Sequence, residues 1–300
     1  MSLLVLGTVA LDDIKTPSGM KRNMLGGSAT HFSMSARLFA KVHLVAVIGK
    51  DFPRKELQFL RRKGIDLTSV VQAPGETFRW QGEYKKEDFN TALTLGTKLG
   101  VLEGYLPEVS AEQRGIPNVF LANIDPDVQM RLLDLIGKPR LIGLDSMNLW
   151  IRIKREPLMK LMKRVDLFVA NDGEARALTG EQNLIKAAKK LRRFGPGLIV
   201  IKKGEHGVLF YSDKFAFSFP AYPVEAVVDP TGAGDTFAGG LMGYLTKAQK
   251  LDLASLKRAV LYATATASFN VENFGMAATA PLTLPAVNKR MRELVEFISC

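Results

Sequence analysis

The stretch from Asp229 to Gly240, with the sequence DPTGAGDTFAGG, holds residue types suited to phosphoryl transfer. Residues 224–228 before it are mostly apolar and predict a short strand, and apolar residues within 237–245 recur at helical spacing. The turn at 232–234 therefore opens a helix. The first peptide N–H groups of a helix have no partner within it and lie at its positive dipole end, so small side chains there let a phosphate approach the backbone.

Asp235 comes directly after the peptide N–H groups of Gly232, Ala233 and Gly234. Because a carboxylate would repel a phosphate bound to these groups, Asp235 needs another task. It is well placed to accept the proton of an attacking hydroxyl, which is the role of the general base in phosphoryl transfer, while the N–H groups stabilise the transferring charge. The alternative is that Asp235 only caps the helix through its side chain.

The same stretch closely resembles the C-terminal signature of the ribokinase-like (PfkB) family of sugar and nucleoside kinases. It is not a Walker A loop, because no Gly-Lys-Ser or Gly-Lys-Thr follows at the required spacing, and it is not the Gly-x-Gly-x-x-Gly motif of dinucleotide sites. The resemblance covers nearly the whole chain. It implies one ribokinase-like domain over residues 1–300, a doubly wound α/β sandwich with a small β-sheet lid formed by segments near 10–20 and 76–104.

Three N-terminal features follow the same family pattern. The resemblance implies that Asp12 accepts hydrogen bonds from the hydroxyls of the sugar, and an exposed turn carboxylate is the alternative. Gly26 and Gly27 resemble the double-glycine motif of the family, and their bare backbone allows a polyol to lie against the chain. His31 stands where many members carry a sugar-binding asparagine; an imidazole also donates or accepts one hydrogen bond, and a structural role is equally open.

A second pair of motifs concerns the metal and the nucleotide. Asn171 and Glu174 match the Asn-x-x-Glu motif of the family, which implies that they organise Mg²⁺, its waters and the phosphates of ATP. The same spacing also forms a helix-capping arrangement. Lys202 and Gly204 lie in a turn that the resemblance places beside the nucleotide, with Lys202 where many members have threonine. The resemblance leaves a monovalent cation open.

Apolar runs and helical stretches alternate along the chain, which predicts a doubly wound α/β fold. Strands buried on both faces of a parallel sheet are near-continuous apolar runs. The expected strands are 3–7, 42–49, 119–123, 141–145, 167–171, 198–201 and 208–211, and the expected helices include 32–39, 53–63 and 262–269.

The interval 77–102 differs, because aromatic and polar residues alternate there with the period of a half-exposed strand. Phe78, Trp80 and Tyr84 belong to this alternation. Phe78 and Trp80 could stack on the base of a substrate. The alternative, weighed equally, is packing within the lid or against the lid of a second copy in a homodimer.

The formal net charge of +11 suits nucleic acid, an anionic membrane surface or phosphorylated ligands. The basic residues are scattered over helical stretches without interleaved aromatic residues, which favours solvated helix faces and no nucleic-acid partner. No apolar run of about 18 residues and no signal peptide is present, so we expect no membrane partner and a cytoplasmic location. The only cysteine, Cys300, allows neither an intrachain disulfide nor a cysteine-ligated metal site.

Together these features predict an ATP-dependent kinase that phosphorylates a hydroxyl of a small sugar or nucleoside, with ATP and Mg²⁺ as cofactors. A nucleic-acid-binding protein, which a strongly salt-dependent affinity would reveal, is one alternative at this stage, and two others remain. One is a kinase for sugar phosphates in the manner of phosphofructokinase, which the net charge of +11 encourages. The other is a non-catalytic regulator that binds a nucleotide or sugar.

Overall fold

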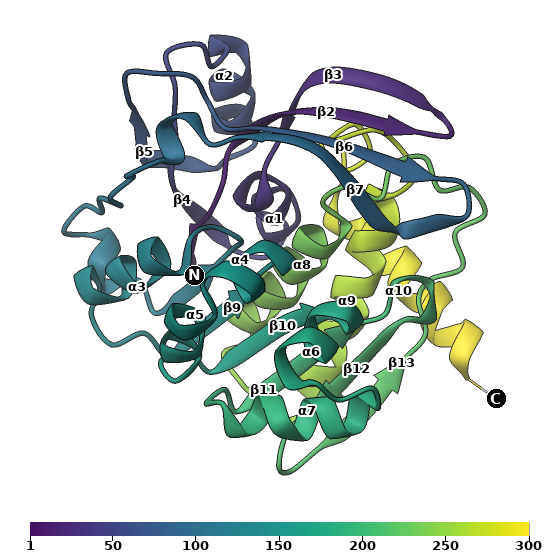
Figure 1. Cartoon of the computed structure of the whole chain (residues 1–300). Helices are drawn as coiled ribbons and strands as arrows, with labels where there is room; N and C mark the ends of the chain where they lie inside the picture. The colour runs from purple at the N-terminus through teal and green to yellow at the C-terminus, as the bar shows by residue number, and fades with distance from the viewer. Residues whose placement is uncertain (300) are drawn as a thin grey trace.

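A nine-stranded sheet forms the centre of the structure, a computed structural model that describes residues 1–299 (Figure 1). The strand order is β13-β12-β11-β10-β9-β8-β1-β4-β5. All neighbours from β11 to β5 are parallel, and β12 and β13 extend one edge in antiparallel fashion. The bounds are β1 (Ser2–Leu6), β4 (Lys41–Ile48), β5 (Asp66–Gln72), β8 (Asn118–Leu121), β9 (Leu141–Asp145), β10 (Leu167–Asn171), β11 (Leu198–Lys202), β12 (Val208–Tyr211) and β13 (Ala216–Phe219).

The chain extends this sheet in two directions from β1. It first adds β4 and β5 on one side, then returns to the other side of β1 with β8 and continues through β9, β10 and β11. In such doubly wound sheets, ligands bind outside the carboxyl ends of the strands at the point where the order reverses. The α/β fold class expected from the sequence is therefore present, and the topology points to one edge of the sheet.

Successive residues of β1 face two separate apolar cores. Leu3 and Val5 belong to the core that contains the stacked rings of Phe32 and Phe120, and Leu4 and Leu6 belong to the opposite one. Because both faces are covered, the strand is apolar throughout. The helices are α1 (Ser28–Ala36), α2 (Arg54–Arg62), α8 (Ala233–Ala248), α9 (Leu253–Asn270) and α10 (Leu284–Ile298), with α3 (Pro126–Leu135), α4 (Asn148–Ile153), α5 (Arg155–Met162), α6 (Asp172–Thr179) and α7 (Leu184–Arg193) contributing to the second core's face.

A second sheet of four strands has the order β3-β2-β6-β7. Two antiparallel hairpins form it and meet through the parallel pair β2 and β6. In Figure 1 it extends across the top of the molecule, away from the layers of the main sheet. The strands are β2 (Ala10–Thr16), β3 (Gly19–Gly26), β6 (Arg79–Lys85) and β7 (Asp88–Lys98), and short 3-10 turns lie at Gly100–Leu102, Gln113–Gly115 and Gly204–His206.

Three local predictions need correction. The strand expected at 224–228 is wrong, because the chain there is irregular. Pro220, Pro223 and Pro230 around it lack the N–H groups that a strand would need for pairing. Helix α1 begins at Ser28, before the residues 32–39 expected from the sequence, and β13 was not expected. Within residues 1–299 no helix combines the length and apolarity that crossing a membrane would require.

Candidate functional site

The glycine-rich turn adopts the helix N-terminus that the sequence predicts. Gly232 precedes α8 in the left-handed conformation, with φ of 72°, and Ala233 is the first helical residue. Asp229 before it is fully buried and accepts hydrogen bonds from the N–H of Thr231, at 2.9 Å, and of Gly275, at 3.0 Å. Its carboxylate thereby fixes the loop that leads into α8. The N–H of Ala233 donates to the carbonyl of Pro230 at 3.1 Å, so this predicted donor is engaged within the loop.

A buried polar cluster lies directly beneath this turn. The Asn270 amide donates to the carbonyl of Thr231 at 2.8 Å, and its oxygen accepts from Thr236 Oγ1 at 3.0 Å. The same oxygen lies 3.2 Å from His31 Nδ1, so this nitrogen carries the proton. Burial lowers the pKa of His31, which keeps the ring neutral. A Cβ on Gly232 would overlap this imidazole, so His31 supports the turn from below whatever it does toward a substrate.

Asp235 occupies the first turn of α8 and is half-buried. The N-cap residue is Gly232, which has no side chain for capping, and the carboxylate of Asp235 interacts with the N–H of its own residue. Burial is the main cause that raises the pKa of Asp235 to about 7; the charge of Lys202 opposes this shift and the charge of Glu174 adds to it. A carboxyl group with such a pKa is suited to accept a proton near neutral pH.

Lys202, the last residue of β11, brings its ammonium group to the start of α8. A Cβ on Gly234 would come within 2.6 Å of Lys202 Nζ. The positive dipole end of the helix and a lysine cation therefore coincide, as at a site for phosphate. This places the predicted Lys202 beside the predicted glycine turn.

Asn171 and Glu174 form the capping box of α6. Glu174 Oε2 accepts from the N–H of Asn171 at 2.8 Å, and Asn171 Oδ1 accepts from the N–H of Glu174 at 2.7 Å. Asn171 also pairs with Lys202 across β10 and β11. Glu174 is buried, and burial raises its pKa while Lys202 opposes the shift. The pair thus caps a helix and still lies at the same strand ends as Lys202.

Asp145 is a site residue that the sequence interpretation missed. It ends β9, as Asn171 ends β10, and only this strand-end position could have revealed it. Its carboxylate is 4% exposed, and Oδ1 has no hydrogen-bond partner within residues 1–299. Burial raises the pKa of Asp145 well above its usual value, with the charges of Asp235 and Glu174 adding to the effect and Lys202 opposing it.

The carboxylates of Asp145, Glu174 and Asp235 with the single ammonium of Lys202 suit a divalent cation. Within residues 1–299 no three acidic, histidine or cysteine side chains form a ready-made metal cage. Mg²⁺ does not need one, because it keeps several waters and binds through one or two carboxylates and the phosphates of its substrate. The unpartnered oxygen of Asp145 is the observation that favours such an ion.

Asp12 lies on the other side of the turn, within the second sheet. Its carboxyl group is 4% exposed, and Oδ1 has no partner within the part of the chain described. Burial raises the pKa of Asp12 to about 7, backbone N–H groups of Gly27 and Trp80 oppose the shift, and the charges of Asp229 and Asp235 add to it. The charges of the glycine-rich turn therefore reach Asp12 in the second sheet.

Gly26 and Gly27 are required by the chain itself. A Cβ on Gly26 would overlap the carboxylate of Asp12, and one on Gly27 would overlap the carbonyl of Thr8. Gly27 also has φ of 94°, which side chains rarely allow. The sequence interpretation attributed both glycines to space for a polyol, whereas the structure gives them a packing reason.

Two aromatic residues of β6, Trp80 and Tyr84, make different contacts. The Trp80 ring lies over Gly82, where a Cβ would overlap it, and its Nε1 donates to Thr94 at 3.2 Å. Tyr84 is 9% exposed, and its hydroxyl accepts from Thr231 Oγ1 at 3.4 Å. The sequence interpretation did not place Tyr84 in the site.

Gly204 faces the tip of the second sheet. A Cβ on Gly204 would overlap the amide of Asn90, and Asn90 Nδ2 donates to Glu205 Oε2 at 3.1 Å. The turn expected beside the nucleotide therefore also contacts the hairpin of β6 and β7.

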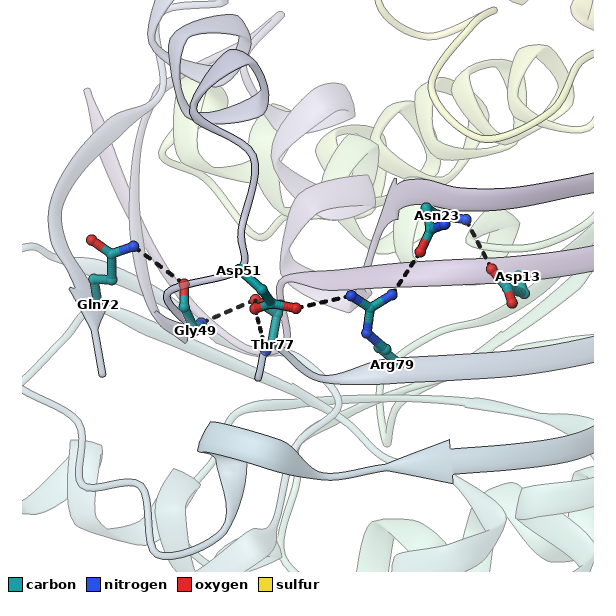
Figure 2. Close-up of polar contacts among 7 residues, drawn as sticks. All are labelled: Asp13, Asn23, Gly49, Asp51, Gln72, Thr77 and Arg79. Atoms are coloured by element: carbon teal, nitrogen blue, oxygen red, sulfur yellow. Dashed lines mark hydrogen bonds and ion pairs between the residues drawn. The ribbon is translucent and has the colours of Figure 1, made fainter. Parts of the chain in front are cut away.

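The base of the second sheet is joined to the end of β4 by the chain of polar contacts in Figure 2. Arg79 pairs with Asp51 at 2.9 Å and donates to Asn23 at 2.6 Å. The other Asp51 oxygen accepts from both the N–H and the hydroxyl of Thr77 at 2.7 Å. Through these contacts Asp51 anchors the base of the second sheet. The remaining members of the chain in Figure 2 are Asp13, Gly49 and Gln72.

Comparisons with known proteins agree with this arrangement. The model of the pfkB family of carbohydrate kinases matches residues 5–283. The cytidine kinase of Thermococcus kodakarensis is 35% identical over 261 residues, which cover 84% of this chain and 91% of that protein.

Two solved structures share the fold over nearly their whole length. The nucleoside kinase of Burkholderia thailandensis in complex with inosine has a TM-score of 0.79 at 18% identity, covering 98% of this chain and 99% of that one. Aminoimidazole riboside kinase from Salmonella enterica, complexed with aminoimidazole riboside and an ATP analogue, has a TM-score of 0.74 at 21% identity, covering 97% and 100%.

Proposed function

The chain belongs to the PfkB family of carbohydrate kinases, and we propose that the hydroxyl it phosphorylates belongs to a nucleoside. Family membership makes it an ATP-dependent phosphotransferase that acts on a sugar or nucleoside, and it implies the use of ATP and Mg²⁺. The observation that carries the choice of acceptor is the convergence of three aspartates with a face of the lid that is rich in aromatic residues.

Negative charge at the acceptor side argues against a sugar phosphate. Asp12, Asp229 and Asp235 interact electrostatically, and two of them are buried. A phosphorylated acceptor would add further negative charge to this set, and charges repel strongly where water is excluded. Arg79, a cation at the base of the lid, is already engaged by Asp51 and Asn23. A neutral polyol that donates hydrogen bonds to Asp12 suits this site better.

The aromatic face of the lid supports a nucleoside over a free pentose. Tyr84 of β6 contacts Thr231, Trp80 lies four residues before it on the same strand, and a base offers a flat partner for an aromatic ring that a free pentose lacks. The similar proteins named above act on or bind cytidine, inosine or aminoimidazole riboside, all of which combine a ribose with a heterocycle.

In the proposed reaction Asp235 accepts the proton of the attacking hydroxyl. The N–H groups of Gly232 and Gly234, together with Lys202 Nζ, stabilise the negative charge of the transferring group, whereas the N–H of Ala233 donates to the carbonyl of Pro230. Mg²⁺, when bound, neutralises phosphate charge. Asp145 and Glu174 would hold it with Asn171 nearby.

On the substrate side, Asp12 would accept hydrogen bonds from the sugar. His31, beside Gly232, would offer Nε2 to it while its other nitrogen remains bound to Asn270. Gly26 and Gly27 allow Asp12 and the start of α1 to approach, and Gly204 would lie against the nucleotide.

The second sheet is proposed to act as a lid, and also as a dimer contact. Leu93 and Leu95 on its edge strand β7 are 49% and 57% exposed, which is unusual for leucine and suits contact with a second lid. Sedimentation of the wild-type chain and of Leu95→Glu tests this. A cytoplasmic location, the absence of a nucleic-acid partner and a monovalent-cation requirement remain expectations, the last testable by comparing rates in K⁺ and Na⁺.

Initial rates of ATP consumption across cytidine, inosine, adenosine, ribose and fructose 6-phosphate test the proposal. We expect a nucleoside to have the highest kcat/KM and fructose 6-phosphate to be inactive. A preference for the hexose phosphate would overturn the nucleoside proposal while leaving the kinase assignment intact. Purified product should carry the phosphate on a hydroxyl of the sugar, and binding of ATP without its consumption in the presence of every acceptor would favour the non-catalytic alternative.

A further inference from the structure

Within residues 1–299, three polar side-chain contacts join β6 and β7 of the lid to the core, in addition to the packing of β2 and β3. At its base, Arg79 and Asp51 form the ion pair drawn in Figure 2, and at its tip Asn90 donates to Glu205. Both contacts are exposed to solvent to a considerable degree. Tyr84 provides the third contact between them, and this one is buried.

The partner of Tyr84 is the residue next to the proposed anion-binding turn. Thr231 Oγ1 donates to the Tyr84 hydroxyl at 3.4 Å. The backbone of Thr231 is held on both sides, because its N–H donates to Asp229 and its carbonyl accepts from Asn270. A contact on the Thr231 side chain therefore acts on a segment with little freedom of its own, immediately before Gly232.

The Tyr84 hydroxyl remains protonated in these surroundings. Burial raises the pKa of Tyr84 above its usual value, and the charges of Asp229, Asp12 and Asp235 raise it further, while the hydrogen bond with Thr231 opposes the shift. The hydroxyl accepts from Thr231, and within residues 1–299 its own proton has no recipient. It is a neutral donor located among the three aspartates of the acceptor side.

We propose that Tyr84 is a positioning residue that couples closure of the lid to the Thr231–Gly234 turn. When the lid is closed, the hydroxyl of Tyr84 holds the side chain of Thr231 and its ring covers the acceptor side. When the lid opens, β6 carries Tyr84 away, because the residue belongs to the lid and not to the core. The turn would then lose one restraint at the residue that precedes its donors, and catalysis would be slower in an incompletely closed enzyme.

This proposal rests on the proposed roles of the turn and of Asp235, but not on the acceptor being a nucleoside. The ring and the hydroxyl of Tyr84 make separate contributions. The ring fills space between lid and core, and phenylalanine would preserve that. The hydroxyl alone makes the bond to Thr231, and phenylalanine would remove it.

The test uses Tyr84→Phe, Thr231→Val and the double variant of the full chain, measured with the best acceptor found in the substrate screen. We expect each single variant to lower kcat about five- to tenfold, the scale of one hydrogen bond, with the KM for ATP and the Tm little changed. Because both remove the same bond, the double variant should be no slower than the slower single variant.

Two controls make the outcome specific. Thr231→Ser keeps a hydroxyl and should recover most of the rate lost in Thr231→Val. Tyr262→Phe removes a comparable hydrogen bond, from the Tyr262 hydroxyl to Asn288 at 2.8 Å, away from the turn, and should leave kcat unchanged. A wild-type kcat in Tyr84→Phe, or losses that multiply in the double variant, would overturn the coupling. Neither outcome would change the proposed role of Asp235 as general base, which Asp235→Asn tests separately.

Discussion

The floor of the site and its lid are stabilised in different ways. The floor consists of Asp229, Asn270 and His31, which are 0%, 0% and 2% exposed and joined to the turn by short hydrogen bonds. The lid packs Leu11 and Leu25 of β2 and β3 into the main core, whereas its β6–β7 hairpin carries leucines that are 49% and 57% exposed and reaches the core through Tyr84 and through polar contacts near the surface.

Buried, fully satisfied polar networks fix one geometry, whereas exposed ion pairs contribute about 0–1 kcal/mol and are easily exchanged for water. The comparison indicates that the floor holds the reacting groups and that the β6–β7 hairpin of the lid selects the acceptor. Variants on the floor should therefore change kcat, and variants on this hairpin other than those at Tyr84, which contacts Thr231, should change the choice of substrate.

The largest effect is expected from Asp235→Asn, which keeps the shape of the side chain and removes its ability to accept a proton. We expect kcat to fall about 10²–10⁴-fold while ATP binding and the Tm are preserved. Asp252→Asn is the matched control, because Asp252 is an exposed acid that caps α9 and its amide can still accept from Ser255. A near-wild-type kcat in purified Asp235→Asn would mean that the acid is structural.

Lowering the pH should have the next largest effect. The pKa values of Asp12 and Asp235 are both about 7, raised mainly by burial, so each group loses its charge as the pH falls through 7. The value of kcat/KM, which reports the free enzyme, should decrease about ten- to a hundredfold between pH 8 and pH 6. The value of kcat should begin to fall at a lower pH than kcat/KM does, because bound Mg²⁺ favours the ionised form of Asp235. A flat profile to pH 5 would contradict both assignments.

On the lid, Trp80→Ala should weaken a nucleoside by roughly ten- to a hundredfold in KM, because stacking of a base on an aromatic ring contributes about 1–3 kcal/mol. A plain sugar should be almost unaffected. Since the ring also covers Gly82 and bonds to Thr94, the same variant could instead lower the Tm or change sedimentation with the KM unaltered. That second pattern would assign Trp80 to packing of the lid. Trp80→Phe, which keeps an aromatic ring, is the control.

The smallest expected effect is that of Glu174→Gln. Glutamine can replace glutamate in a capping box, so α6 should keep its start. Loss of the charge should raise the Mg²⁺ concentration for half-maximal rate roughly three- to tenfold, or about 0.7–1.4 kcal/mol, more than it raises the KM of the acceptor. If the Mg²⁺ dependence stays the same, Asn171 and Glu174 serve only to cap the helix.

Much of the fold could be predicted because strands buried on both faces are apolar throughout. The segment 141–145 agrees with β9, and 167–171 agrees with β10. The family resemblance is confirmed, since residues 5–283 match the family. The error at 224–228 arose because apolar composition was given more weight than the prolines around it.

The missed site residues have a different cause. Tyr84 belongs to a hairpin whose register shifts twice against β7, between Gln81 and Gly82 and between Glu83 and Lys85, so periodicity alone could not show which side chains face the core. Asp145 could be assigned to the site only from the structure, in which β9, β10 and β11 are neighbours and end at the same edge of the sheet. The contact between His31 and Gly232 joins residues far apart in the chain, and no local pattern indicates it.

The contact between His31 and Gly232 limits which substitutions the protein can accept at these two positions. Gly232 is constrained twice, by its φ of 72° and by the imidazole of His31 against its Cα. A smaller residue at position 31 would remove the steric contact with the imidazole but not the backbone conformation that favours glycine. A larger residue at position 232 therefore cannot be compensated by a smaller one at position 31, as often happens between neighbouring core residues. Mutational scanning should therefore find position 232 intolerant in every background, whereas position 31 should tolerate residues that still bond to Asn270.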